Sequence, residues 1–137
     1  MKKVILGLDE LSIIVEDILK KFSNGVILLR GDLASGKTTL TKEIVSYLGV
    51  EDTVTSPTFS IQQCYAKNIF HYDIYNKGLE NFIALGMLEE LEKDGLHLVE
   101  WGDDGLKKIL LDAGFDVLEI NIKKIKNNKR EYEICTF

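Results

Sequence analysis

The chain has 137 residues, of which 45% are hydrophobic and 28% charged, the composition of an ordinary globular domain. This length predicts one domain, residues 1–137, with a substantial core. It is too short for two domains that each have a core of that size. The net charge of −5 excludes a surface that is basic throughout, which is typical of many nucleic-acid-binding proteins.

Hydropathy and cysteine content indicate a cytoplasmic protein. The two cysteines, Cys64 and Cys135, are far apart and fit no metal-ligand spacing, so we expect reduced thiols. The apolar start of the chain ends at Gly7, too early for the apolar segment of a signal peptide. No apolar run approaches the roughly 18 residues that a membrane-spanning helix needs.

Strands and helices alternate along the chain in the hydropathy pattern. The pattern predicts strands at 3–8, 26–29, 60–65, 68–75, 96–99, 116–124 and 130–137, and helices at 10–22, 38–48, 78–86, 87–93 and, after a cap at 103–104, up to 111. Hairpin turns are expected at 66–68 and 127–128. We therefore predict an α/β, P-loop NTPase-like three-layer fold, with a mixed, mostly parallel sheet and an antiparallel C-terminal hairpin.

The strongest motif is residues 31–38, GDLASGKT, which fits the phosphate-binding P-loop pattern G-x-x-x-x-G-K-[ST]. It lies between a predicted buried strand and a predicted helix, where backbone N–H groups and the helix dipole attract an anion. Gly31 and Gly36 allow the loop to curl. In such a loop Lys37 binds the β- and γ-phosphates, and the Thr38 hydroxyl binds Mg²⁺.

A magnesium ion at a P-loop needs carboxylates from neighbouring strands. Glu100 directly follows the apolar run 96–99, and Asp73 lies within the predicted strand 68–75. We expect one or both to lie beside the P-loop. The alternative for Glu100 is a solvated acid at a turn, and for Asp73 an ion-paired strand residue.

Three other side chains, His71, Trp101 and Thr58, have a functional and a structural interpretation. His71 shares a strand face with Asp73 and either orients it, contacts phosphate or is a satisfied buried residue, whereas His97 is interpreted as structural. The only tryptophan, Trp101, either stacks on an adenine or packs in the core. Thr58 follows the only proline, in a stiff loop where it either senses the γ-phosphate or caps its own turn.

The segment 123–130 holds five basic residues and no acids. It either contacts an acidic partner or RNA, or forms a solvated hairpin tip, and the hairpin tip is the commoner case.

Together these segments resemble the TsaE (YjeE) family of small bacterial ATPases. The similarity covers nearly the whole chain and rests on residues 31–39 (GDLASGKTT), 56–59 (SPTF), 71–75 (HYDIY) and 100–101 (EW). In addition, Ser12 stands where the family usually has a threonine near the nucleotide.

The resemblance implies an ATPase with ATP/ADP and Mg²⁺ as cofactors. It implies that the protein supports turnover of a TsaD–TsaB-like complex, which makes N6-threonylcarbamoyladenosine at position 37 of tRNA, and meets tRNA through that complex. It implies Mg²⁺ binding by Thr38 and Glu100, and a role in hydrolysis for Asp73, Lys37 and Thr58. The implied nucleotide-binding residues are Ser12, Asp32, Leu33, Ala34, Ser35, Gly36, Lys37, Thr38, Thr39 and Trp101.

The sequence departs from the family pattern at several positions. Ala34 and Ser35 replace the usual Gly-Ala of the P-loop, Asn76 replaces an arginine, and Gly102 replaces a proline.

Two functions other than ATP hydrolysis are possible for a P-loop protein of this kind. A kinase is disfavoured because Arg30 and Arg130 are the only arginines available to clamp a transferred phosphate. A nucleotide sensor without hydrolysis uses the same residues as an ATPase and stays open.

Overall fold

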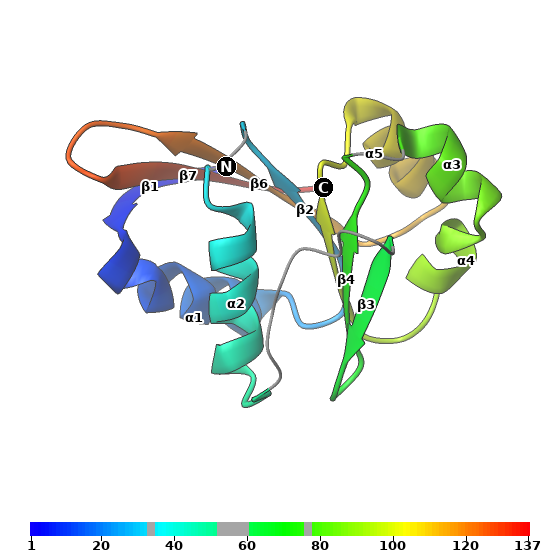
Figure 1. Cartoon of the computed structure of the whole chain (residues 1–137), viewed down its shortest axis with the longest axis horizontal. Coiled ribbons are helices and arrows are strands. Elements are labelled where there is room, and N and C mark those ends of the chain that lie inside the picture. Colours follow the sequence, from blue (N-terminus) through cyan, green and yellow to red (C-terminus); the bar gives the residue numbers. More distant parts are fainter. Residues whose placement is uncertain (33–34, 52–60, 76–77) are drawn as a thin grey trace.

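In the computed structural model, a seven-stranded sheet is covered by helices on both faces (Figure 1). The structure describes residues 1–32, 35–51, 61–75 and 78–137. The strands are β1 (Lys2–Gly7), β2 (Gly25–Arg30), β3 (Gln62–Tyr65), β4 (Ile69–Asp73), β5 (Leu96–Glu100), β6 (Val117–Lys124) and β7 (Lys129–Thr136). The helices are α1 (Leu11–Lys21), which follows the 3-10 turn η1 (Leu8–Glu10), α2 (Lys37–Tyr47), α3 (Gly78–Ala84), α4 (Met87–Leu91) and α5 (Asp104–Asp112). Within these described segments, every helix is too short or too polar to span a lipid bilayer.

The strand order is β1-β7-β6-β2-β5-β4-β3. β6, β2, β5 and β4 are mutually parallel, and β1 points the same way because it is antiparallel to β7, which is antiparallel to β6. β3 and β7 therefore run opposite to the other five strands. The predicted mostly parallel sheet with an antiparallel C-terminal hairpin is confirmed, and the carboxyl ends of β2, β5 and β4 lie at one edge.

The two faces of the sheet form two separate hydrophobic cores. Ile27 and Leu29 of β2 pack with α1 and α2, whereas the alternating residues Val26 and Leu28 pack with α3, α4 and α5. Strand side chains alternate between faces, so one buried strand contributes to both cores. Figure 1 shows the same division, with α1 and α2 on one side of the sheet and α3, α4 and α5 on the other.

Most predicted element boundaries agree with the structure to within a few residues. The two hairpin turns have adjacent left-handed residues, Lys67 and Asn68 in one and Asn127 and Asn128 in the other, as two-residue hairpin loops require. One difference lies at the first helix, which was predicted from residue 10. The Glu10 side chain accepts a hydrogen bond from the Gly7 N–H (2.9 Å), and a 3-10 turn precedes α1.

His97 is a satisfied core residue, as predicted. Its Nε2 donates to the Lys93 carbonyl (2.7 Å), so its Nδ1 accepts from the Tyr72 hydroxyl (2.7 Å). Burial lowers the pKa of His97, which favours this neutral form. His97 therefore ties β5 to β4 on the face away from the P-loop.

Candidate functional site

The P-loop joins β2 to α2 through two glycines in conformations that other residues avoid. Gly31 has φ +152° and Gly36 has φ +113°. A Cβ at Gly31 would lie 2.5 Å from the Ile122 carbonyl oxygen and 2.5 Å from Ser35 Oγ. The loop thus needs glycine here for both backbone conformation and space, as its sequence predicted.

Replacing Gly31 by alanine is expected to lower the free energy of unfolding by about 2 to 4 kcal/mol, since strain and overpacking combine. Gly114→Ala is the matched control, because Gly114 also has a positive φ (+86°) but has open space around it. The control is expected to cost about 1 kcal/mol. Urea unfolding of both variants measures the difference, and equal losses would show that the contacts of Gly31 are unimportant.

Lys37, the first residue of α2, is folded back over the P-loop. Its Nζ donates to the carbonyl oxygens of Gly31 (2.8 Å) and Asp32 (2.9 Å), and lies 3.4 Å from Ser35 Oγ. The Trp101 ring covers it, with Nζ 3.9 Å from the ring centroid, a cation–π contact. Burial lowers the pKa of the Lys37 ammonium, while Glu100 and Asp73 act in the opposite direction.

Glu100 ends β5 beside the start of α2. The Thr38 hydroxyl lies 3.0 Å from Glu100 Oε1 and 3.3 Å from Oε2, so it hydrogen-bonds the carboxylate. Only 2% of Glu100 is exposed, which means that a charged group is buried at the carboxyl edge of the sheet. The two residues predicted to hold magnesium are therefore in direct contact, across 62 positions of sequence.

His71 contacts Glu100 rather than Asp73. Its Nε2 donates to Glu100 Oε2, and its Nδ1 lies 3.4 Å from the Tyr65 hydroxyl. The suggestion that His71 orients Asp73 is wrong, because residues two apart on a strand are separated by roughly 6–7 Å, whereas β5 lies directly beside β4. His71 instead holds the Glu100 carboxylate through Oε2, the oxygen that also lies 3.3 Å from the Thr38 hydroxyl.

Asp73 ends β4, directly opposite Glu100 in the parallel register of the two strands. Its Oδ1 accepts a hydrogen bond from the Tyr75 N–H (3.0 Å). Burial raises the pKa of Asp73, and the nearby Glu100 carboxylate adds to this increase, against the hydrogen bond from Tyr75. Asp73 therefore lies in a partly desolvated place beside the predicted metal ligands.

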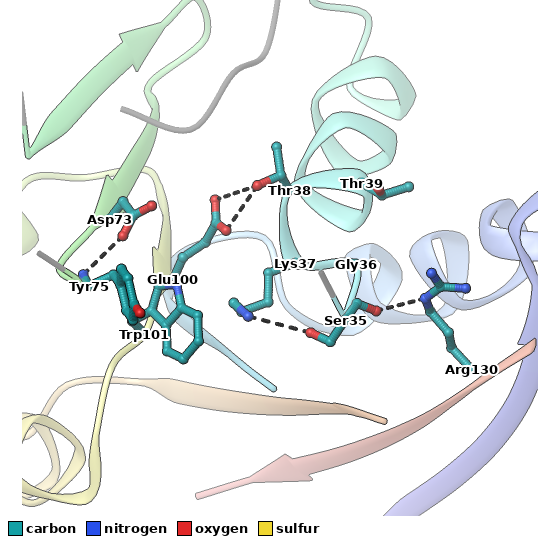
Figure 2. A pocket seen from close by; sticks show the side chains of 10 residues that line it. All are labelled: Ser35, Gly36, Lys37, Thr38, Thr39, Asp73, Tyr75, Glu100, Trp101 and Arg130. Atoms are coloured by element: carbon teal, nitrogen blue, oxygen red, sulfur yellow. Dashed lines mark hydrogen bonds between the residues drawn. The ribbon is translucent and has the colours of Figure 1, made fainter. Parts of the chain in front are cut away.

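These side chains line one pocket of about 400 Å³ (Figure 2). Its lining residues are Ser35, Gly36, Lys37, Thr38, Thr39, Asp73, Tyr75, Glu100, Trp101 and Arg130. The acids, Tyr75 and Trp101 lie on one side of Lys37, and Arg130 lies on the other. The volume falls in the range of small-molecule sites, about 300 to 1,000 Å³.

Other predicted site residues lie away from this lining or outside the described residues. Ser12 is exposed in the first turn of α1, and Asp32 is exposed but lends its carbonyl to Lys37. Leu33, Ala34 and Thr58 lie outside the described residues. Their functional roles stay predictions.

Sequence reasoning missed the contribution of two residues, Tyr75 and Arg130, to the pocket, whereas Trp101 was among the predicted nucleotide-binding residues. Trp101 adopts a left-handed backbone with φ +68°, and its ring packs on Tyr75 with centroids 4.5 Å apart. Arg130, interpreted as part of a solvated hairpin tip, instead reaches the P-loop. A local pattern does not show this, because the contact depends on β7 lying two strands from β2. Only Tyr75 could have been placed near the site from the sequence, because a residue two positions after Asp73 lies on the same face of the strand.

The chemistry of these donors fits magnesium bound together with a nucleotide. Among the described residues no three acidic, histidine or cysteine side chains gather into a metal cage. Magnesium needs no such cage, because phosphate oxygens and waters complete its octahedron around one or two protein ligands. The Thr38 hydroxyl and the Glu100 carboxylate supply oxygen ligands of the required kind.

Comparison with known proteins places the chain in a family. The family model for "Threonylcarbamoyl adenosine biosynthesis protein TsaE" matches residues 8–132. A tRNA threonylcarbamoyladenosine biosynthesis protein TsaE from Rickettsia conorii is 40% identical over 118 residues, 82% of this chain. The chain spans 65% of that relative, slightly less than two thirds of its length.

Two further similarities come from Bacillus subtilis. Its protein named TsaE is 34% identical over 113 residues, which cover 74% of this chain and 71% of the relative. The crystal structure of B. subtilis YdiB superposes with a TM-score of 0.68 at 28% identity, over 98% of this chain and 85% of that chain. The chain therefore belongs to the TsaE family of tRNA threonylcarbamoyladenosine biosynthesis proteins.

Proposed function

We propose that this protein binds and hydrolyses ATP in a magnesium-dependent reaction and thereby supports turnover of a TsaD–TsaB-like transferase. Its site of action would be the cytoplasm, where that complex modifies position 37 of tRNA and brings tRNA to it indirectly. The observation that carries the proposal is the contact of the Thr38 hydroxyl with the buried Glu100 carboxylate, next to Lys37 in the same pocket.

Each residue has a distinct part in this proposal. The Lys37 ammonium exchanges the carbonyl oxygens of Gly31 and Asp32 for phosphate oxygens of the nucleotide. Thr38 and Glu100 hold magnesium, which neutralises charge on the phosphates. His71 keeps the Glu100 carboxylate facing Thr38.

Asp73 is suited to position the attacking water. It lies in the same pocket, and its raised pKa makes the carboxylate a better proton acceptor than an exposed one. Trp101 covers Lys37 and limits the access of water to the ammonium. Ordered backbone N–H groups at the start of α2 add positive potential toward the phosphates.

The arginines disfavour transfer to an acceptor other than water. Arg30 is bound to Glu119 (2.5 Å) and Asp104 (2.8 Å) and cannot also clamp a transferred phosphate. A kinase typically uses several such cations. The pocket therefore supports hydrolysis, or binding without hydrolysis, better than phosphoryl transfer.

Phosphate release from ATP tests the proposal. The purified protein is assayed with Mg²⁺, alone and with a TsaD–TsaB pair, beside Lys37→Ala. We expect slow release alone, faster release with the pair, and none above background for Lys37→Ala. Phosphorylation of an acceptor would support a kinase, and ATP binding without release under both conditions would support a sensor.

A further inference from the structure

The two arginines of the chain differ in how their charge is balanced. Arg30 donates to the Gly102 carbonyl (2.8 Å) and to the carboxylates of Glu119 and Asp104, and Glu119 is itself 4% exposed. Arg30 is therefore neutralised inside the fold. Arg130 donates from Nε to the Ser35 carbonyl (2.7 Å) and, at 3.5 Å, from Nη1 to the Asn128 carbonyl. Across the described part of the chain, no carboxylate pairs with Arg130.

Arg130 is held in a fixed position against the P-loop. It stands near the start of β7, and its side chain crosses to the loop from the C-terminal hairpin. A Cβ on Gly36 would lie 3.2 Å from Arg130 Nε, so the side chain packs directly over that glycine. Figure 2 shows the guanidinium beside the Ser35 carbonyl, on the side of Lys37 away from Asp73.

The charges of the pocket are thus unevenly distributed. Asp73 and Glu100 are on one side, where Lys37 faces them, and Arg130 alone lies on the other side. Backbone carbonyls orient the guanidinium but do not cancel its full charge. An arginine that lines a pocket without a carboxylate partner is suited to bind an anionic group of a ligand.

The orientation of a nucleotide at a P-loop indicates which of its anionic groups lies near Arg130. The lysine and the magnesium ligands meet the β- and γ-phosphates, and the loop backbone holds the α- and β-phosphates. The side of the pocket away from Thr38 and Glu100 therefore faces the α-phosphate and the nucleoside. Here the positive charge comes from Arg130, on a different structural element from the P-loop.

We propose that Arg130 is a nucleotide-binding residue whose guanidinium contacts the α-phosphate side of the bound nucleotide. The C-terminal hairpin, which lies between β1 and β2 in the sheet, then also completes the site. This inference rests on the proposed nucleotide binding. Since the α-phosphate is common to ATP and ADP, Arg130 would strengthen the binding of both nucleotides equally.

Equilibrium binding of ADP to the wild type, Arg130→Ala and Arg130→Lys tests the proposal, with Trp101 fluorescence or calorimetry as readout. Lys126→Ala is the matched control, since Lys126 is an exposed cation of the same hairpin. A charge-assisted contact predicts a tenfold to hundredfold higher Kd for ADP in Arg130→Ala, a smaller rise in Arg130→Lys and no change in the control. The same factor is expected for ATP.

Salt dependence separates contact with the nucleotide from simple support of the loop. If the charge acts on the phosphate, the ratio of Kd between Arg130→Ala and wild type falls toward one as sodium chloride is raised to 0.5 M, because screening weakens the attraction. A ratio that is independent of salt, or an unchanged Kd in Arg130→Ala, would overturn the proposal. If the wild type itself binds no ADP, the proposed function fails instead.

Discussion

Asp73→Asn is expected to lower the rate of phosphate release from ATP about a hundredfold, the usual contribution of a side chain that moves or positions a proton. Its affinity for ATP should change little, because Asp73 hydrogen-bonds only the Tyr75 N–H among the described residues. Asparagine keeps an oxygen for that bond, so the loop stays in place. Single-turnover phosphate release and ATP binding measure the two effects separately.

Asp112→Asn serves as the control for the loss of one carboxylate. Asp112 is exposed at the end of α5, where it pairs with Lys108. This variant should release phosphate at the wild-type rate. Loss of ATP binding in Asp73→Asn would contradict the hydrolytic role and make Asp73 a ligand contact or a structural residue.

Glu100→Gln is expected to raise the magnesium concentration needed for half-maximal activity by tenfold to a hundredfold. Glutamine can still accept a hydrogen bond from Thr38, so the variant removes the charge with little change of shape. Magnesium titrations of phosphate release measure the effect. Glu89→Gln, on the exposed surface of α4, should titrate as the wild type does.

An unchanged magnesium titration in Glu100→Gln would remove this residue from the metal site. The buried contact with His71 would then have a purely structural role. Thermal unfolding of the variant checks this, because loss of a buried charged hydrogen bond lowers stability whether or not metal binds.

Local patterns predicted the elements of this fold well. The run Val26-Ile27-Leu28-Leu29 became the central strand β2 because a fully apolar run can contribute to both cores at once. The alternation in β4 placed Ile69 and His71 on the P-loop face and Tyr72 on the other. These features depend on periodicity within a few residues, which the sequence shows directly.

Long-range pairing was less predictable from the sequence. The strand order places β6 between β2 and β7, so the carboxyl edge of β2 lies close enough to the hairpin for Arg130 to reach the P-loop. The left-handed backbone of Trp101 could not be predicted from the sequence either, since a bulky residue rarely adopts this conformation. In this conformation the Trp101 ring lies over Lys37, with Nζ 3.9 Å from the ring centroid.

Asp73 and Glu100 are an intermediate case. Glu100 was a candidate because it directly follows an apolar strand, and Asp73 because an aspartate within a strand is unusual. The P-loop, which needs acidic partners for magnesium, gave both a reason to be there. The parallel pairing of β4 with β5 puts them side by side. What the sequence did not indicate is the chain of contacts from Thr38 through Glu100 to His71, which depends on three separate elements.

The most direct test of a magnesium–nucleotide site is a crystal structure with Mg²⁺ and a non-hydrolysable ATP analogue. We expect the phosphates at Lys37, the Thr38 hydroxyl about 2.1 Å from magnesium, and Glu100 bound to the ion directly or through a water. Asp73 should face the γ-phosphate. A nucleotide bound outside the pocket, or magnesium remote from both Thr38 and Glu100, would contradict the account.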